Sequence, residues 1–137
     1  MNQRGFATLE VILMVMVIGI LASIAVPRFT SVTAAANTAK IQSDLTTIDT
    51  AIAIHQMEKG TDPANVQALV DAKYLQSEPE PPTGQCYMGE ENSTKVPATS
   101  YTFSGSGSEM RAVCGENNTA DKFHLKKAQT TTGKTGE

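Results

Sequence analysis

Residues 11–27 read VILMVMVIGILASIAVP, and this uncharged stretch decides the fold of the N-terminal part of the chain. Together with residues 6–10 it gives about 22 largely apolar residues, or ~33 Å of α-helix, which matches the thickness of a bilayer core. The preceding MNQRG is short and polar, and its Arg4 would hold that end on the cytoplasmic side. The stretch therefore predicts a helix that is covered by lipid or by another apolar surface.

Glu10 distinguishes between three interpretations of this stretch. A cleaved secretory signal would end near Ser23-Ile24-Ala25, and a simple signal anchor would remain as a helix. Neither interpretation needs a carboxylate inside hydrocarbon, which costs roughly 2.5 to 3.5 kcal/mol and is usually functional. At the membrane interface the charge would be cheap, but Glu10 lies beyond four residues, Phe6 to Leu9, that are mostly apolar. A third interpretation gives it a cation, the α-amine that a cut before Phe6 would create in a neighbouring subunit.

The sequence RGFATLE at residues 4–10, followed by the apolar run and Pro27, resembles the N-terminus of the type IV pilin family. That family includes the type II secretion pseudopilins and the competence pilins. The resemblance implies that a prepilin peptidase cleaves after Gly5 and methylates the amine of Phe6, and that Glu10 is the subunit-assembly residue. It also implies that the helix can break between Gly19 and Pro27 when the subunit moves from lipid into a filament. From the residues alone, Gly19 and Pro27 are simply tolerated, because membrane helices accept glycine and proline.

Beyond Arg28 the pattern becomes amphipathic, because apolar residues recur at spacings of three and four on one helical face. Gly60 is a typical helix end. We therefore expect one helix from about Phe6 to Lys59, ~54 residues long. The stripe comprises Ile41, Leu45, Ile48, Ile52 and His55, widened by Ala51 and Ile54. The expected segments are a cleaved leader (1–5), a transmembrane or filament-core helix (6–27), an amphipathic helix (28–60), a globular head (61–127) and a flexible tail (128–137).

The head is predicted to combine a short helix with antiparallel strands. Asp62-Pro63 would cap a helix ending near Lys73. Strands are expected at 86–88, 100–104 and 110–114, with a hairpin turn at 105–108 and a short edge strand at Phe123 and Leu125. The expected fold class is α+β, with a small antiparallel sheet packed against the second half of the long helix.

Cys86 and Cys114 are the two cysteines of the chain. In an exported head they would form a disulfide closing a loop of about 29 residues, worth roughly 3 to 4 kcal/mol. Many pilins have a similar disulfide-bounded region, although two reduced, buried thiols are the alternative. The spacing lacks the CxxC pattern of a metal site.

The sequence predicts neither an enzyme nor a cofactor. His55 is expected to be buried and hydrogen-bonded, His124 stands alone, and no serine has the framing of a catalytic nucleophile. Net charge is -3 with no basic stripe, so nucleic acid is not an expected partner. The acids Glu78, Glu80, Glu90 and Glu91 could hold calcium but fit a solvated rim better, since a spaced Asp/Gly loop is missing. Asn92-Ser93-Thr94 matches an N-glycosylation sequon, which is a short pattern.

The expected function is the major structural subunit (pilin) of a type IV pilus-like filament, processed by prepilin peptidase and held in the inner membrane before assembly. Its head would lie outside the cytoplasm, and the filament would be a cell-surface or periplasmic homopolymer. The chain has no nucleotide-binding motif, so the energy for assembly must come from elsewhere. The resemblance implies that an assembly platform protein and an ATPase supply it. The alternatives are a major pseudopilin of type II secretion, a competence pilin, and a secreted binding protein whose mature chain starts near Val26 rather than at Phe6.

Overall fold

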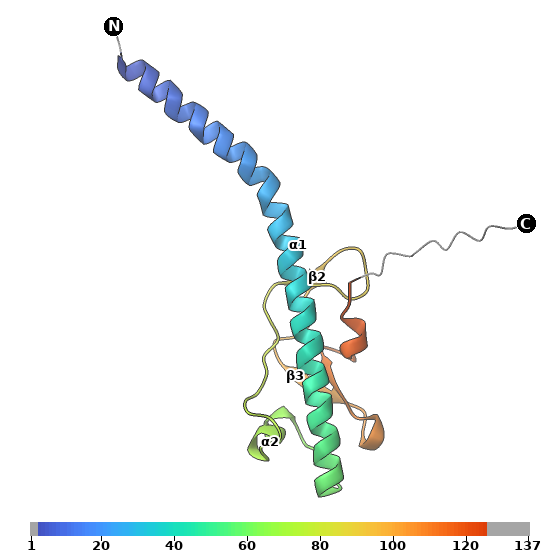
Figure 1. Ribbon diagram of the computed structural model, residues 1–137. Coiled ribbons are helices and arrows are strands. Elements are labelled where there is room, and N and C mark those ends of the chain that lie inside the picture. Colours follow the sequence, from blue (N-terminus) through green and yellow to red (C-terminus); the bar gives the residue numbers. More distant parts are fainter. Residues whose placement is uncertain (1–2, 126–137) are drawn as a thin grey trace, which may run out of the picture. The chain divides into compact units, whose positions relative to one another are not determined.

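The computed structural model describes residues 3–125, which form a long helix, a short helix and four short strands (Figure 1). The fold is α+β, as predicted. Helix α1 is Gln3–Lys59, which confirms the single long helix and begins it three residues earlier than expected. The chain divides into two units between Thr33 and Ala34. The predicted tail at 128–137 and the first two residues of the predicted leader lie outside the described residues.

Within the second unit, α1 presents the predicted apolar stripe to the core of the head. Ile41, Leu45 and Ile48 are completely buried because their spacing of three and four keeps them on one face. Two predicted members differ. His55 is only half-buried, and Ile54 is 41% exposed because it lies beside the stripe rather than in it. The helix ends at Lys59, and the next residue, Gly60, has a φ of 68°, a conformation that glycine adopts without strain.

Helix α2 (Val66–Asp71) is shorter than predicted and has a different N-cap. Its cap is Asn65, whose side-chain oxygen accepts a hydrogen bond from the Ala68 amide at 2.8 Å. The predicted cap, Asp62, instead accepts hydrogen bonds from the Gly107 amide at 2.8 Å and from Gln56 at 3.0 Å. Asp62 therefore joins the end of α1 to a distant loop.

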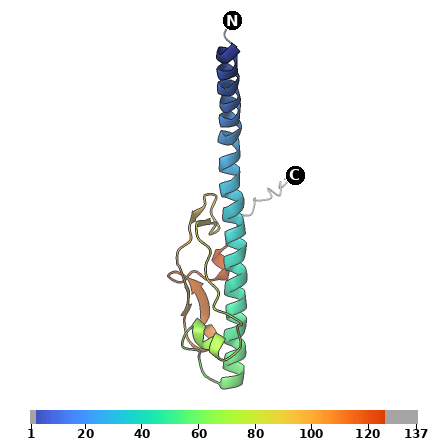
Figure 2. The same ribbon diagram turned by 90° about the vertical axis from the view of Figure 1, so that its left-hand side faces the viewer.

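The strands form two separate antiparallel pairs instead of one sheet. In the first, β1 (Gln85–Cys86) pairs with β2 (Thr94–Lys95). In the second, β3 (Tyr101–Ser104) pairs with β4 (Arg111–Cys114), with Tyr101 opposite Cys114. The predicted tight turn at 105–108 is a longer loop that contains a short 3-10 helix, η1 (Gly107–Glu109). Figure 2 shows these strands along one side of the head portion of α1.

The predicted edge strand at Phe123 and Leu125 is wrong. The chain forms a 3-10 helix, η2 (Ala120–Lys122), immediately before Phe123. The ring of Phe123 is fully buried in the same apolar cluster as Ile41 and Leu69, whereas Leu125 is exposed. Phe123 thus contributes to the core as a single inserted side chain rather than through strand pairing.

Candidate functional site

The part of α1 before the head is an uncovered apolar surface. Every described residue from Gln3 to Thr33 is exposed except Ala25, which is partly covered. This stretch is also long and apolar enough to cross a membrane, and none of its most apolar window is buried. The large exposed apolar side chains before Pro27 are Phe6, Leu9, Val11, Ile12, Leu13, Met14, Val15, Met16, Val17, Ile18, Ile20, Leu21, Ile24 and Val26. Because a helix that is apolar all round is unfavourable in water, this surface requires lipid or other protein helices around it.

Glu10 is the only acidic residue in this stretch and lies one helical turn after Phe6. Both side chains are exposed, with Phe6 at 77%. Gly5, the residue before the predicted cut, lies in the first turn of α1, and the Gly19 and Pro27 positions lie inside the helix. The structure thus places the predicted processing and assembly residues within two turns of one another at one end of an apolar rod.

The hydroxyl groups of this stretch are bonded to the helix itself. Thr8 donates to the carbonyl of Arg4 at 3.0 Å, and Ser23 donates to that of Ile20 at 2.7 Å. Thr30, Ser31 and Thr33 make the same kind of bond to carbonyls three or four residues earlier. Each hydroxyl donor is therefore satisfied without water, which suits a helix in a non-aqueous environment.

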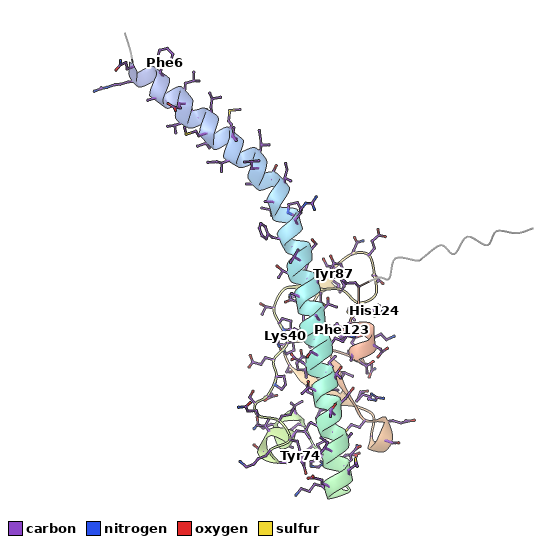
Figure 3. The ribbon with its side chains drawn as sticks, viewed as in Figure 1. Phe6, Lys40, Tyr74, Tyr87, Phe123 and His124 are labelled. Atoms are coloured by element: carbon purple, nitrogen blue, oxygen red, sulfur yellow. The ribbon has the colours of Figure 1, made fainter. Side chains whose placement is uncertain are left out.

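In the head, polar side chains of α1 bind the backbone of the segment 80–87, which contains β1; Figure 3 labels Lys40 and Tyr87 of this group. The Asn37 amide donates to the carbonyls of Thr83 and Gln85 at 3.1 and 2.9 Å. The Lys40 ammonium donates to the carbonyl of Glu80 at 2.8 Å, and the Thr38 hydroxyl accepts from the Tyr87 amide at 2.7 Å. Sequence reasoning missed this group, because backbone partners 40 or more residues away leave no local pattern.

A second polar contact ties β3 to α1. The buried Tyr101 donates its hydroxyl to Asp44 Oδ2 at 2.8 Å, and Lys40 Nζ pairs with the same oxygen at 2.5 Å. Burial, and then the hydrogen bond to Asp44, raise the pKa of Tyr101 well above its ordinary value. The phenol is therefore held in its neutral form and acts as a structural donor.

Cys86 and Cys114 are both fully buried and belong to the same core cluster. Both are free cysteines in this structure. Burial raises the pKa of each thiol; for Cys114, a backbone hydrogen bond involving Ala98 opposes this and the nearby Cys86 adds to it. Buried thiols of raised pKa are poor nucleophiles and poor metal ligands, so a structural role fits better.

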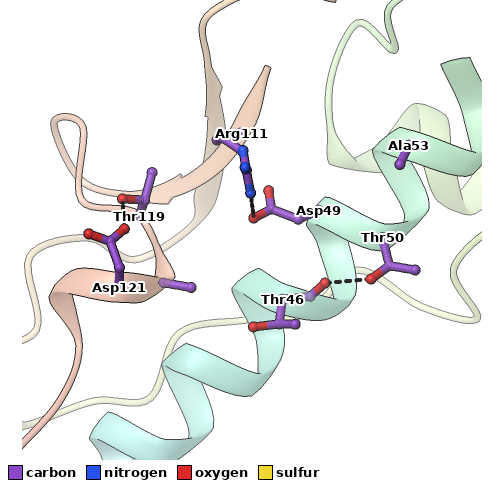
Figure 4. Close-up of a pocket in the computed structure, with 8 residues that line it drawn as sticks. Thr46, Asp49, Thr50, Ala53, Arg111, Thr119 and Asp121 are labelled. Carbon is purple, nitrogen blue, oxygen red and sulfur yellow. Dashed lines mark hydrogen bonds and ion pairs between the residues drawn. The ribbon is translucent and has the colours of Figure 1, made fainter. Parts of the chain in front are cut away.

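A groove of about 730 Å³ lies between α1, β4 and η2 (Figure 4). Its acid on α1, Asp49, accepts from the Ala112 amide at 2.7 Å and from Arg111 at 3.4 Å. On the opposite side, the Thr119 hydroxyl donates to Asp121 and lowers the pKa of that carboxyl. Asp49 thus joins α1 to β4, whereas the Asp121 contact is local to the start of η2. The residues that line the groove include neither a histidine nor a cysteine to act as base or nucleophile.

The two histidines also have structural contacts. His55 Nδ1 lies 3.0 Å from the Thr61 carbonyl and its ring meets Tyr74 edge-on, while His124 Nδ1 lies 2.8 Å from the Asp121 carbonyl. Within residues 3–125, no three His, Cys, Asp or Glu side chains are grouped so as to hold a metal ion.

Comparison with known proteins finds relatives from type IV pili and from type II secretion systems. The type IV narrow pilus major component PilA5 of Thermus thermophilus is 31% identical over 115 residues, covering 78% of this chain and 91% of the relative. Type II secretion system core protein G of Klebsiella pneumoniae is 29% identical over 103 residues, covering 64% and 74%. The core protein G of Escherichia coli K12 is 29% identical over 100 residues, covering 71% and 66%. No protein-family model and no solved structure matches the chain.

Proposed function

Since the chain belongs to the family of type IV pilins and type II secretion pseudopilins, we propose that it is the major structural subunit of a type IV pilus-like filament. The observation that carries the proposal is the uncovered apolar helix from Phe6 to Val26. Bundling such helices from many copies would bury this surface and leave the heads on the outside. The similarity to a pilus major component over 91% of that relative's length supports a pilin, because it includes the head as well as the helix.

In this proposal, the first helical turns of α1 determine where the precursor is cleaved and how neighbouring subunits align in the filament. Prepilin peptidase cleaves after Gly5 and methylates the new amine of Phe6. The amine of one subunit then pairs with Glu10 of its neighbour, and this pair sets the axial register. A subunit one step out of place would bury an unpaired carboxylate among apolar side chains, at a cost of about 3 to 5 kcal/mol. Incorrect registers are thus selected against by charge rather than by shape.

The proposal assigns further roles along the chain. The segment from Gly19 to Pro27 opens its helical hydrogen bonds as the subunit leaves the lipid, which the missing amide of Pro27 makes easier. Cys86 and Cys114 form a disulfide once the head is outside the cytoplasm. The precursor spans the inner membrane once, and the platform protein and ATPase of the machine supply the force and energy for assembly.

The second candidate is the major pseudopilin of a type II secretion system, which the core protein G relatives favour. The two candidates share processing and helix packing, and they differ in whether the filament extends beyond the cell surface. A pilin is abundant in material sheared from the cell surface, whereas a pseudopilin is recovered with the membranes.

The test combines mass spectrometry with two substitutions. The mature chain should begin at an N-methylated Phe6 and be abundant in sheared filaments. Glu10→Gln and Glu10→Ala should leave cleavage intact and abolish filaments, whereas Glu109→Gln, which removes an exposed acid of the head, should assemble normally. A mature start near Val26, or normal filaments from Glu10→Ala, would contradict the proposal.

A further inference from the structure

The loop between β1 and β2 carries an accessible sequon. Asn92, Ser93 and Thr94 match the N-x-S/T pattern of N-linked glycosylation. Both Asn92 and Thr94 are exposed, and no hydrogen bond within residues 3–125 engages either side chain. The two groups that a transferase must reach, the acceptor amide and the threonine hydroxyl, are therefore both free.

The ends of this loop are fixed although its tip is open. The Gly89 amide donates to the His124 carbonyl at 2.8 Å, and Ser93 donates its hydroxyl to Gln85 Oε1 at 2.6 Å. Gly89 has a φ of 77°, and a Cβ at this position would lie 2.9 Å from His124 Nε2. The loop is thus held on both sides while Glu90 to Asn92 stay exposed.

The chain contains a second sequon that serves as an internal comparison. Asn117, Asn118 and Thr119 have the same pattern, but all three side chains are used by the fold. Asn117 Oδ1 accepts from Ser104 at 2.8 Å, Asn118 Nδ2 donates to the Cys114 carbonyl at 3.1 Å, and Thr119 donates to Asp121. Asn117 is also in the left-handed region, at φ 61°. A transferase would have to break these contacts to use this site.

We propose that Asn92 is an N-glycosylation acceptor and that Asn117 is not. The donor is a sugar carried on a polyprenyl pyrophosphate. The Asn92 amide nitrogen bonds to the anomeric carbon of the sugar, the bond from that carbon to the pyrophosphate breaks, the lipid pyrophosphate leaves, and the amide loses one proton. The exposed Glu90 carboxylate, two residues before the acceptor, offers a charge for a basic side chain of the transferase. This inference rests on the proposed function, because transfer takes place on the exported side of the membrane.

Tryptic digestion of the protein purified from its own cells separates the two sequons. After reduction, Asn92 lies on the peptide 74–95 and Asn117 on the peptide 112–122. We expect an added glycan mass on 74–95 alone, and enzymatic release that cuts the amide bond should leave Asp at position 92. Unmodified 74–95 in all molecules, or a glycan on 112–122, would overturn the proposal.

Four substitutions locate the glycan and separate sequon chemistry from folding. Asn92→Gln and Thr94→Ala should remove the added mass, Thr94→Ser should keep it, and Asn117→Gln should leave it unchanged. A mass that persists in Asn92→Gln would mean attachment elsewhere and would refute the assignment. The same spectra report the N-terminus, so a mature start at Phe6 with bare 74–95 refutes only the glycan. A start at another residue refutes the proposed function.

Discussion

Tyr101→Phe tests the hydrogen bond that ties β3 to α1. Tyr101 is 3% exposed and donates to an Asp44 oxygen that also pairs with Lys40. The substitution removes one hydroxyl and keeps the ring, so the apolar packing is preserved. Because Lys40 still neutralises Asp44, the change isolates the tyrosine donor.

The expected loss can be worked from these contacts. A hydrogen bond to a charged group contributes about 1.5 to 3 kcal/mol. The Asp44 side chain is 20% exposed and keeps its partner Lys40, so water and the ammonium compensate part of the loss. We therefore expect the unfolding free energy to fall by about 1 to 2 kcal/mol at pH 7. For a head of this size, this corresponds to a melting temperature lower by about 5 to 15 °C.

The same substitution should change the alkaline stability. Burial and the Asp44 contact raise the pKa of Tyr101 in the folded head. Its stabilising contribution is therefore complete below the unfolded pKa near 10 and is lost as the pH rises above that value. The wild type should lose stability above about pH 10 more steeply than Tyr101→Phe, so that the difference between them narrows.

Calorimetry of the full chain in detergent measures both effects without relying on a tyrosine signal. Tyr87→Phe is the matched control, since within the described residues no hydrogen bond uses its hydroxyl, and it should melt close to the wild type. An unchanged melting temperature for Tyr101→Phe at pH 7 would refute the reasoning. If the wild type and Tyr101→Phe lost stability equally above pH 10, the expected link between the Tyr101 pKa and stability would be refuted.

Two further predictions concern the head. Protein taken from filaments and unfolded in denaturant should show no thiol that reacts with a thiol reagent, because Cys86 and Cys114 are expected to form a disulfide. Reduction, or Cys86→Ser, should lower the unfolding free energy by about 3 to 4 kcal/mol. Two free thiols in fresh filaments would contradict this prediction. Gly89→Ala should cost about 1 to 3 kcal/mol in urea unfolding, because it adds contact with His124 to backbone strain. Gly107→Ala is the control, because φ is 57° there and the added Cβ meets nothing within 4 Å, so it should cost only the backbone strain. Equal losses of unfolding free energy in the two variants would show that the contact with His124 contributes nothing.

The long helix could be predicted because its signals extend over many residues. The apolar run and the later stripe of Ile41, Leu45 and Ile48 each repeat a pattern, and the repeats reinforce one another. The strands at Tyr101–Ser104 and Arg111–Cys114 were predicted within one residue, since alternation brackets a glycine-rich turn. The separation of this hairpin from the β1–β2 pair was not predictable, because it depends on contacts between distant segments.

The errors in the head have the same physical origin. Asp62 followed by proline is a typical helix start, but its carboxylate is bound by Gly107 and Gln56 from other parts of the head, and Asn65 caps α2 instead. Phe123 has the residue type of a strand and is used as a single core side chain. In both cases tertiary contacts override a local preference.

The roles of Gly5, Phe6 and Glu10 stay predictions, and they could be proposed from the sequence because they depend on a short local motif that resembles the pilin N-terminus. A glycine, a phenylalanine and a glutamate within two helical turns need no long-range information to be recognised. The polar side chains of α1 that bind the segment 80–87 could not be predicted from a local motif. Asn37 and Lys40 resemble ordinary surface residues, and their partners are carbonyls, which every residue carries.

The way in which α1 holds the segment from Glu80 to Tyr87 has a consequence for how this head can evolve. Asn37, Thr38 and Lys40 contact the segment through its main-chain atoms, so these anchors do not depend on which side chains the segment carries. Exposed positions of the segment such as Thr83 can mutate without loosening it. The segment can thus change its exposed side chains while its backbone stays in place, and it is a suitable position at which to graft a peptide.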